Sequence, residues 1–370
     1  MQLGFFTMPI HPMNKDWRTC LREDREAFIL ADELGFAEAF VGEHATDKSE
    51  NVTSCTMFLA SLADATKQIK LGTGTINLPN SHPVTIASQI AMLDHLLDGR
   101  LLFGISPGGL LSDAEAYDNL DADRNAMFLE GINQVLEIWA SEPPYNIKGN
   151  YWNISTEKTL FAEVGQGIMP KPLQRPHPPI IVAVVAPFSK GVTEAAARGW
   201  DPISANFLLP KWTASHWPKY VEGCARIDRT ADPANWRIAR SIFVADDEAT
   251  ARAYARDPGS PYRYYFEQFV LKLINAGRSD LIKQDPSAPD DSIDIEAVMD
   301  QLVFYGTPDK VADQILAFRE EVGDFGILTY AGHDWVDRDL ARRSMVLLAE
   351  KTMPLVNSAI SKTPQQNAAQ

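Results

Sequence analysis

The chain has 370 residues, of which 45% are hydrophobic, and its 34 Lys and Arg against 49 Asp and Glu give a net charge of −15. This length and hydrophobic content suit a large core. The acidic balance argues against nucleic acids and anionic membranes as partners. An apolar run on the order of 18 residues, as a membrane span needs, is missing, and so is a signal-peptide pattern.

The three cysteines, Cys20, Cys55 and Cys224, lie far apart and form no CxxC motif. We therefore expect reduced thiols in a cytoplasmic protein. The sequence has neither an HExxH motif nor another compact group of metal ligands, so we expect no metal site.

Strands and helices are expected to alternate along the chain. The expected strands lie at 3–8, 36–42, the start of 70–83, the start of 101–109, 179–185, 201–207, 236–245 and 325–330. The expected helices lie at 21–34, 53–66, 84–100, 124–140, 189–198, 211–228, from 246, at 308–322 and at 338–353. Residues 143–174 are an expected insertion with a hairpin near 148–150, and 257–300 is a second insertion.

The segment 70–109 shows the repeating unit best. Between two apolar strands, a helical face is indicated by apolar residues spaced 4, 3 and 4 apart: Ile86, Ile90, Leu93 and Leu97. Gly99 follows at a position typical of a helix C-cap. A helix between two parallel strands predicts an α/β protein.

Eight expected strands, each followed by a helix, predict a (β/α)8 TIM barrel with insertions. We expect a single domain over 1–356 and a disordered tail over 357–370. Active sites of such barrels lie at the C-terminal ends of the strands. Residues expected there are Met8, His11, Glu43, His44, 75–77, 106–108, 186–189, Asn206 and 330–333.

This expected rim lacks a carboxylate cluster and a credible Ser-His-Asp arrangement, but it is rich in glycines, hydroxyls, amides and isolated histidines. It suits a flat cofactor with a polar edge, which would carry the difficult chemistry. Residues 71–84, 93–105 and Glu43-His44 resemble the bacterial luciferase-like flavin monooxygenases. Residues 106–113 look more like the limonene and diketocamphane monooxygenase branch than like luciferase.

The resemblance implies a dimeric barrel that binds reduced FMN at its rim. Oxygen would add to the flavin to give a peroxyflavin, which would oxygenate a small, mostly apolar substrate. His44 matches the family's catalytic histidine, Gly74-Thr75 matches the position of a cis peptide, and Pro107 replaces a phosphate-binding arginine. The implied cofactor contacts are Gly74, Thr75, Asn77, Ser106, Gly108, Phe188, Ser189 and Thr193. From their expected places at the rim, we also expect Met8, His11 and Phe207 in the substrate pocket.

The same residues could instead have purely structural roles. His44 could be a hydrogen-bonded structural histidine, and Glu43 a salt-bridge partner. His82-Pro83 is expected to shape the turn into a helix, and Ser189 and Thr193 could be ordinary N-caps. His11 and His333 are only rim candidates. The aromatic run 262–266 could be a packing patch or part of a lid over 257–300.

A GxGxxG motif after a strand is missing, which argues against a dinucleotide-binding domain. Reduced FMN would then come from a separate reductase, and the lid would exclude water. Two alternatives remain open: a deazaflavin-dependent oxidoreductase of the same superfamily, and a non-catalytic flavin-binding protein.

Overall fold

The computed structural model describes residues 1–362, and the chain falls into two compact units. We call residues 38–183 the central unit, and residues 1–37 with 184–362 the terminal unit. Each is described by itself. Whether the chain acts as the expected single domain stays a prediction. Within the described residues, the helices are too short or too polar to span a membrane.

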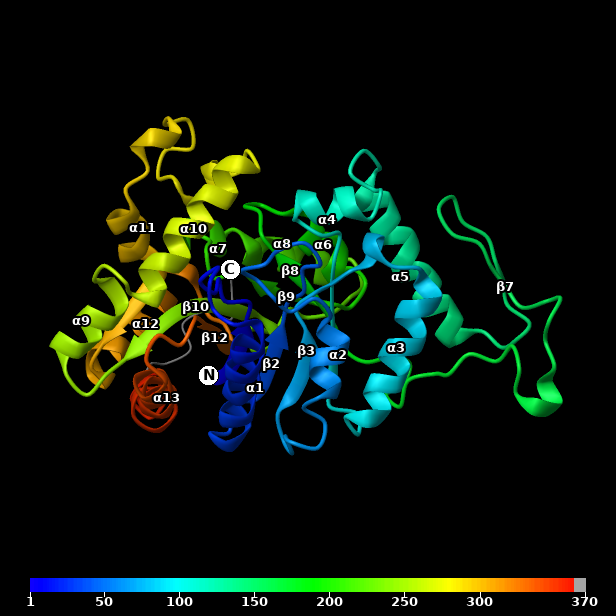
Figure 1. The fold of residues 1–370 in the computed structure, drawn as a ribbon, viewed down its shortest axis with the longest axis horizontal. Coiled ribbons are helices and arrows are strands. Elements are labelled where there is room, and N and C mark those ends of the chain that lie inside the picture. The colour runs from blue at the N-terminus through cyan, green and yellow to red at the C-terminus, as the bar shows by residue number, and fades with distance from the viewer. Residues whose placement is uncertain (363–370) are drawn as a thin grey trace. The chain divides into compact units, whose positions relative to one another are not determined.

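The central unit is built on parallel strands (Figure 1). β2 (Glu38–Val41) pairs with β3 (Lys70–Thr73), β3 pairs with β5 (Leu101–Ser106), and β5 pairs with β4 (Ile76–Asn77) and β8 (Ile180–Val184). Its helices are α2 (Cys55–Ala60), α3 (Pro83–Leu96), α4 (Leu111–Ala116) and α5 (Arg124–Ala140), with short turns η1 (Leu78–Asn80) and η2 (Ala162–Val164). The expected hairpin is present as β6 (Asn146–Ile147) and β7 (Ile154–Ser155).

Local chemistry explains the start and end of α3. The imidazole of His82 accepts a hydrogen bond from the backbone N–H of Val84 at 3.2 Å, and Pro83 is the first helical residue. Gly99 has φ +75°, which a glycine adopts without steric cost. The expected turn at His82-Pro83 and the expected stop at Gly99 are both confirmed.

The terminal unit also contains parallel strands. β12 (Ile327–Gly332) lies between β1 (Gln2–Thr7) and β10 (Arg237–Val244), and β10 also pairs with β9 (Asp201–Ser204) and β11 (Val303–Gly306). The helices are α1 (Trp17–Glu33), α6 (Lys190–Ala196), α7 (Pro210–Ala214), α8 (His216–Ala225), α9 (Glu248–Arg256), α10 (Pro261–Asn275), α11 (Ile295–Leu302), α12 (Pro308–Val322), α13 (Arg338–Leu347) and α14 (Met353–Lys362). Shorter turns are η3 (Pro233–Asn235), η4 (Ser279–Ile282), η5 (Asp290–Ser292) and the π-helical η6 (Leu348–Thr352).

Four expectations about these elements need correction. α1 begins at Trp17 because Asp16 caps it, and the helix expected over 211–228 is divided into α7 and α8. β11 was not expected. The disordered tail is wrong for residues 357–362, which belong to α14; residues 363–370 lie outside the described part of the chain.

Candidate functional site

A chain of hydrogen bonds joins Thr75, which lies between β3 and β4, to Ser106 and Asn77, the last residues of β5 and β4. Thr75 donates its hydroxyl hydrogen to Ser106 Oγ at 2.7 Å, and Ser106 donates to Asn77 Oδ1 at 2.8 Å. The backbone N–H of Gly108 also donates to Ser106 Oγ, at 3.2 Å. Strand register explains this meeting, because Asn77 lies opposite Ser106 in the β4–β5 pair. Four of the expected cofactor contacts therefore form one network.

The backbones of β3 and β5 pack closely beside this network. The Thr73 hydroxyl donates to the Gly104 carbonyl oxygen at 2.7 Å. A Cβ atom on Gly104 would lie 1.7 Å from the Thr73 carbonyl oxygen, so only glycine fits there. The peptide bond between Gly74 and Thr75 is cis, which confirms the position implied by the resemblance.

His44 is held by a carboxylate. Its Nδ1 lies 2.9 Å from Asp113 Oδ2, and Asp113 Oδ1 accepts hydrogen bonds from the backbone N–H and the hydroxyl of Thr46 at 2.9 and 2.7 Å. The carboxylate is thus fixed from both sides, and it fixes the plane of the imidazole. His44 Nε2 lies 3.9 Å from a carboxylate oxygen of Glu50, beyond hydrogen-bond range.

Electrostatics favours the protonated form of this histidine. Burial lowers the pKa of His44, but the hydrogen bond to Asp113 and the charges of Glu50 and Asp113 more than offset it and raise the pKa above 6.5. Asp113 shows the complementary effect. Burial raises the pKa of Asp113, but the hydrogen bonds from His44 and Thr46 lower it by more, so that the pKa lies below 3.8.

Glu43 has neutral partners. Its Oε2 accepts from both the backbone N–H and the thiol of Cys55, each at 2.9 Å, and burial raises the pKa of Glu43 above 4.5. The Asn77 amide donates to the Glu43 backbone carbonyl at 3.4 Å. Glu43 therefore connects α2 to the segment that carries His44 and to the Asn77 network.

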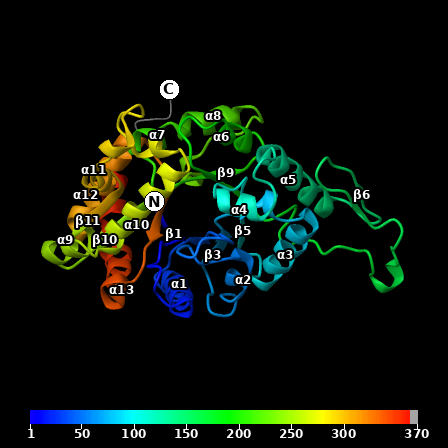
Figure 2. The same cartoon turned by 45° about the horizontal axis from the view of Figure 1, so that its top comes forward.

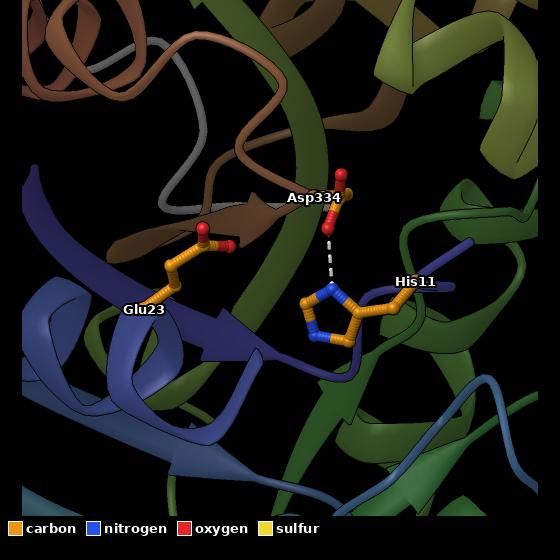
Figure 3. Close-up of side chains that lie close together, drawn as sticks. All are labelled: His11, Glu23 and Asp334. Carbon is orange, nitrogen blue, oxygen red and sulfur yellow. Dashed lines mark hydrogen bonds and ion pairs between the residues drawn. The ribbon is translucent and has the colours of Figure 1, made fainter. Parts of the chain in front are cut away.

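The substrate-pocket candidates lie in the terminal unit. Met8 is half-buried, whereas His11 is buried, and its Nδ1 lies 2.5 Å from Asp334 Oδ1 (Figure 3). Its Nε2 lies 3.4 Å from Asp24 Oδ2. Burial lowers the pKa of His11, but the bonds to Asp24 and Asp334 raise it overall, to about 9. Both ring nitrogens are thus engaged, and His11 anchors the loop after β1. Its contact with substrate stays a prediction.

His11 belongs to a group of possible metal ligands that also includes Glu23 of α1 and Asp334 after β12. Among the described residues, His11, Glu23 and Asp334 bring ligand atoms within 4.8 Å of one another (Figure 3). However, the Lys15 ammonium lies 2.5 Å from Glu23 Oε2 and 2.7 Å from Asp334 Oδ1. A lysine and a protonated histidine already supply cations to these carboxylates, so we interpret the group as an ion-pair cluster.

The loop between β8 and α6 holds the remaining cofactor candidates. Phe188 is exposed, has φ +50°, and donates its N–H to Ser215 Oγ at 2.8 Å. Within the described residues the Ser189 side chain makes no capping hydrogen bond to α6. Thr193 is buried and donates to the Lys219 carbonyl at 3.2 Å. Ser189 is thus the N-cap residue of α6 by position, without a capping hydrogen bond from its side chain, whereas Thr193 lies inside the helix and its donor is already used.

Aromatic side chains of α10 cover His333. The His333 ring centroid lies 4.3 Å from that of Tyr262 and 4.6 Å from that of Tyr265, and its Nε2 lies 2.8 Å from Ser241 Oγ. Burial lowers the pKa of His333 to about 3. Phe207, the third pocket candidate, packs against Phe269 of α10 at 4.5 Å. The run 262–266 thus packs on the residues at the ends of β10 and β12.

Sequence reasoning missed two residues of the central-unit site. Asp113 was part of the segment used for the resemblance but received no role, although a carboxylate just after a strand-end glycine turn was a usable signal. Arg124 donates to the Gly108 carbonyl at 3.3 Å, and nothing in its sequence surroundings indicated this contact.

Comparison with known proteins shows which family the chain resembles. The family model described as luciferase-like monooxygenase matches residues 1–324. Limonene 1,2-monooxygenase of Rhodococcus erythropolis is 29% identical, over 96% of this chain and 87% of its own. The oxygenase component of a flavin-dependent trigonelline monooxygenase of Acinetobacter baylyi is 28% identical, over 67% of this chain and 66% of its own.

A solved structure extends the likeness to three dimensions. The oxygenating constituent of 3,6-diketocamphane monooxygenase from Pseudomonas putida, a type II Baeyer-Villiger monooxygenase in complex with FMN, is 25% identical. It has a TM-score of 0.85, over 96% of this chain and 98% of its own. This chain belongs to the luciferase-like monooxygenase family, and its fold is the expected eight-stranded parallel (β/α)8 barrel with surrounding helices.

Proposed function

We propose that this protein is a monooxygenase that uses O2 and reduced FMN, supplied by a separate reductase, to oxygenate a small, mostly apolar organic substrate. The observation that carries the proposal is the fixed His44–Asp113 pair, joined through Glu43 and Asn77 to the Thr75–Ser106 network. The named activities of the relatives support the reaction class.

The residues at this site fit a flavin by their chemistry. Thr75, Asn77 and Ser106 offer hydroxyl and amide groups, which can exchange donor and acceptor roles along the polar edge of a ring. Asn77 and Ser106 are the last residues of parallel strands β4 and β5, and Thr75 follows β3; barrel enzymes bind ligands at such strand ends. Ser189, whose side chain leaves α6 uncapped among the described residues, is our candidate for a phosphate contact.

Bound reduced FMN would supply the electrons that reduce oxygen and allow one oxygen atom to pass to the substrate. The protein's own part is to orient the ring through Thr75, Asn77 and Ser106 and to manage a proton. His44 would hold that proton at Nε2, because its Nδ1 is bound to Asp113. Asp113 would keep the imidazole oriented and favour its protonated form by raising its pKa.

The proposed partner and substrate class rest on sequence motifs and on the relatives. The absence of a GxGxxG motif after a strand, and a relative named as an oxygenase component, support a separate reductase. Half-buried Met8 and Phe207 in the terminal unit, and relatives named for limonene and diketocamphane, support a small ketone, terpene or aldehyde.

Anaerobic titration followed by an oxygen pulse tests this function. The full chain is titrated with reduced FMN and, separately, with a reduced deazaflavin, and then mixed rapidly with oxygenated buffer. We expect tighter binding of reduced FMN, an oxygen-dependent absorbance transient, and oxygenated product from a panel of terpenes and cyclic ketones. Selective deazaflavin binding with no oxygen-dependent transient would favour the oxidoreductase alternative, and flavin binding without turnover the non-catalytic one.

A further inference from the structure

Four polar side chains that the proposed function does not use lie together next to α10 in the terminal unit. They are Asn206 after β9, Ser241 in β10, His333 after β12 and Tyr265 in α10. Each of the four residues is at most 6% exposed. Figures 1 and 2 both show α10 beside β10, where the Tyr262 hydroxyl donates to a backbone carbonyl of β10 at 2.5 Å.

The neighbour of Ser241 in β10 shows which way this serine points. Arg240 donates to the Thr213 hydroxyl of α7 at 3.0 Å and lies over the Phe318 ring of α12, so it faces the surrounding helices. Successive side chains of a strand point to opposite faces, and Ser241 therefore points away from α7 and α12. Two of the other members follow the C-terminal ends of their strands, the end at which barrel enzymes bind ligands.

The hydrogen-bond donors of this group lack close acceptors. Asn206 Nδ2 lies 3.3 Å from the Tyr265 hydroxyl oxygen and 3.5 Å from Ser241 Oγ, and both distances exceed the usual limit of about 3.2 Å. His333 Nε2 lies 2.8 Å from Ser241 Oγ, whereas its buried Nδ1 has no hydrogen-bond partner within residues 1–362. Buried polar groups without good partners are unfavourable, so the group is suited to take up a further hydrogen-bonding atom.

Aromatic rings lie beside the Asn206 amide. The ring centroids of Phe207 and Phe269 are 4.5 Å apart, and the Tyr265 ring stacks on Phe269 with its centroid at 5.8 Å. Phe207 and Phe269 are only half-buried, whereas Asn206 is buried. A ligand that reaches the amide past these two rings therefore needs an apolar body.

The four side chains favour a neutral ligand atom over an ion. Asn206, Ser241 and Tyr265 are uncharged near neutral pH, and burial lowers the pKa of His333 to about 3, which keeps its ring neutral as well. Burying an ion among uncharged groups is unfavourable. A carbonyl oxygen is a neutral acceptor for the amide N–H, whereas a hydrocarbon offers no acceptor at all.

We propose that Asn206 donates a hydrogen bond to the carbonyl oxygen of the substrate, which makes a small ketone or aldehyde, and not a terpene hydrocarbon, the substrate class of this protein. The inference rests on the proposed oxygenation of a small organic substrate and adds the residue that recognises it. Ser241 and Tyr265 are positioning residues, since their oxygen atoms hold the amide until a carbonyl oxygen replaces them. Phe207 and Phe269 pack against the carbon skeleton.

Ligand binding to the full chain without flavin tests this recognition. Norcamphor and its parent hydrocarbon norbornane, which share one carbon skeleton, are titrated and followed by saturation-transfer NMR. We expect Asn206→Leu to reduce the preference for norcamphor over norbornane by about tenfold, because leucine has a similar size but no N–H group. Asn275→Leu, an exposed position at the end of α10, is the matched control and should keep the preference. Circular dichroism checks that each variant folds.

A second variant should change the binding in the opposite direction. Tyr265→Phe removes an oxygen atom that competes for the Asn206 hydrogen but keeps the ring that stacks on Phe269. Norcamphor should bind about threefold more tightly to this variant, and norbornane should bind as it does to the wild type. Because the change removes one hydroxyl group, this variant decides the question if Asn206→Leu does not fold.

Turnover with reduced FMN separates this inference from the proposed function. Asn206→Leu should raise KM for norcamphor about tenfold and leave kcat nearly unchanged. If no ligand gives product, the proposed function fails, while the flavin-free titrations still decide the role of Asn206. An unchanged preference in Asn206→Leu, weaker norcamphor binding in Tyr265→Phe, or no norcamphor binding by the wild type would overturn the inference and leave an ordered water as the partner of the amide.

Discussion

At the scale of single residues, the clearest feature of the site is an imidazole whose orientation and charge are set by a carboxylate. Asp113 holds His44 Nδ1 at 2.9 Å and is itself held by Thr46. A histidine fixed in this way directs its other nitrogen outward as a proton donor or acceptor.

Removing the charge of Asp113 should shift the pH dependence of turnover. The pKa of His44 lies above 6.5, so His44 is protonated below that pKa and loses its proton as the pH rises through it. Asp113→Asn should lower this pKa. If His44 acts as an acid, the alkaline decline of kcat/KM moves to lower pH. Glu115→Gln, an exposed carboxylate of α4, should leave the profile unchanged. A decline that stays in place in Asp113→Asn would contradict the role of Asp113.

Removing the imidazole should separate binding from chemistry. His44→Ala should lower the rate of product formation by about 10²- to 10⁴-fold, the usual range for a lost acid or base. Its dissociation constant for reduced FMN should change by only a few-fold. His177→Ala is the matched control, because His177 lies in the same unit and contacts the neighbouring Pro178 carbonyl at 2.8 Å. Equal losses of affinity and turnover would make His44 a binding residue.

The buried His11 cluster should make folding stability depend on pH. Its folded pKa of about 9 lies above the ordinary 6.5, so its contribution is complete below pH 6.5 and is lost as the pH rises through 9. This difference corresponds to about 3 kcal/mol. Denaturant unfolding at pH 6 and pH 9.5 should show this loss in the wild type and a much smaller one in His11→Asn. Parallel pH curves for both proteins would assign the loss to other groups.

At the scale of elements, strand register decides which side chains meet. The β4–β5 pairing brings Asn77 opposite Ser106, and the close approach of Gly104 to Thr73 holds β3 against β5. The sequence predicted that these residues lie at strand ends, but it could not show which strands pair with each other. The hydrogen-bond network of the site is therefore a property of paired elements.

Filling the space at Gly104 should disrupt this pairing. In Gly104→Ala the new Cβ would meet the Thr73 carbonyl oxygen, which is backbone and cannot move aside. We expect a loss of about 3 kcal/mol or more in unfolding free energy, at the upper end for overpacking. Gly109→Ala is the control, since its Cβ would meet nothing within 4 Å. Similar unfolding midpoints for the two variants would mean that β3 and β5 separate easily.

The bounds of some elements could be predicted from the sequence alone. Helices α5 and α12 have the expected bounds, 124–140 and 308–322, because each has a helical apolar pattern and a clear start signal. β11 was missed because its four residues, 303–306, directly follow α11 and have no strand pattern of their own. Pairing with β10 makes this segment a strand.

At the scale of the whole molecule, binding of the proposed cofactor should stabilise the fold. A ligand that binds only the folded chain, at 100 times its dissociation constant, adds about 2.7 kcal/mol. For a chain of this size we expect Tm to rise by about 3–5 °C with reduced FMN under anaerobic conditions. Differential scanning fluorimetry with an oxygen-free control lacking flavin measures this. An unchanged Tm at saturating reduced FMN would contradict the cofactor assignment.

The sequence by itself determined the barrel and its family, because the periodicity of apolar residues and the motifs at 71–84 and 93–105 are local in the chain. It also located the candidate histidine and the residues beside it. Only the tertiary structure decided the partners. Asp113 binds His44 across 69 positions, and Asp334 binds His11 across 323. Such contacts depend on how strands and loops meet in space, and no local pattern encodes that meeting.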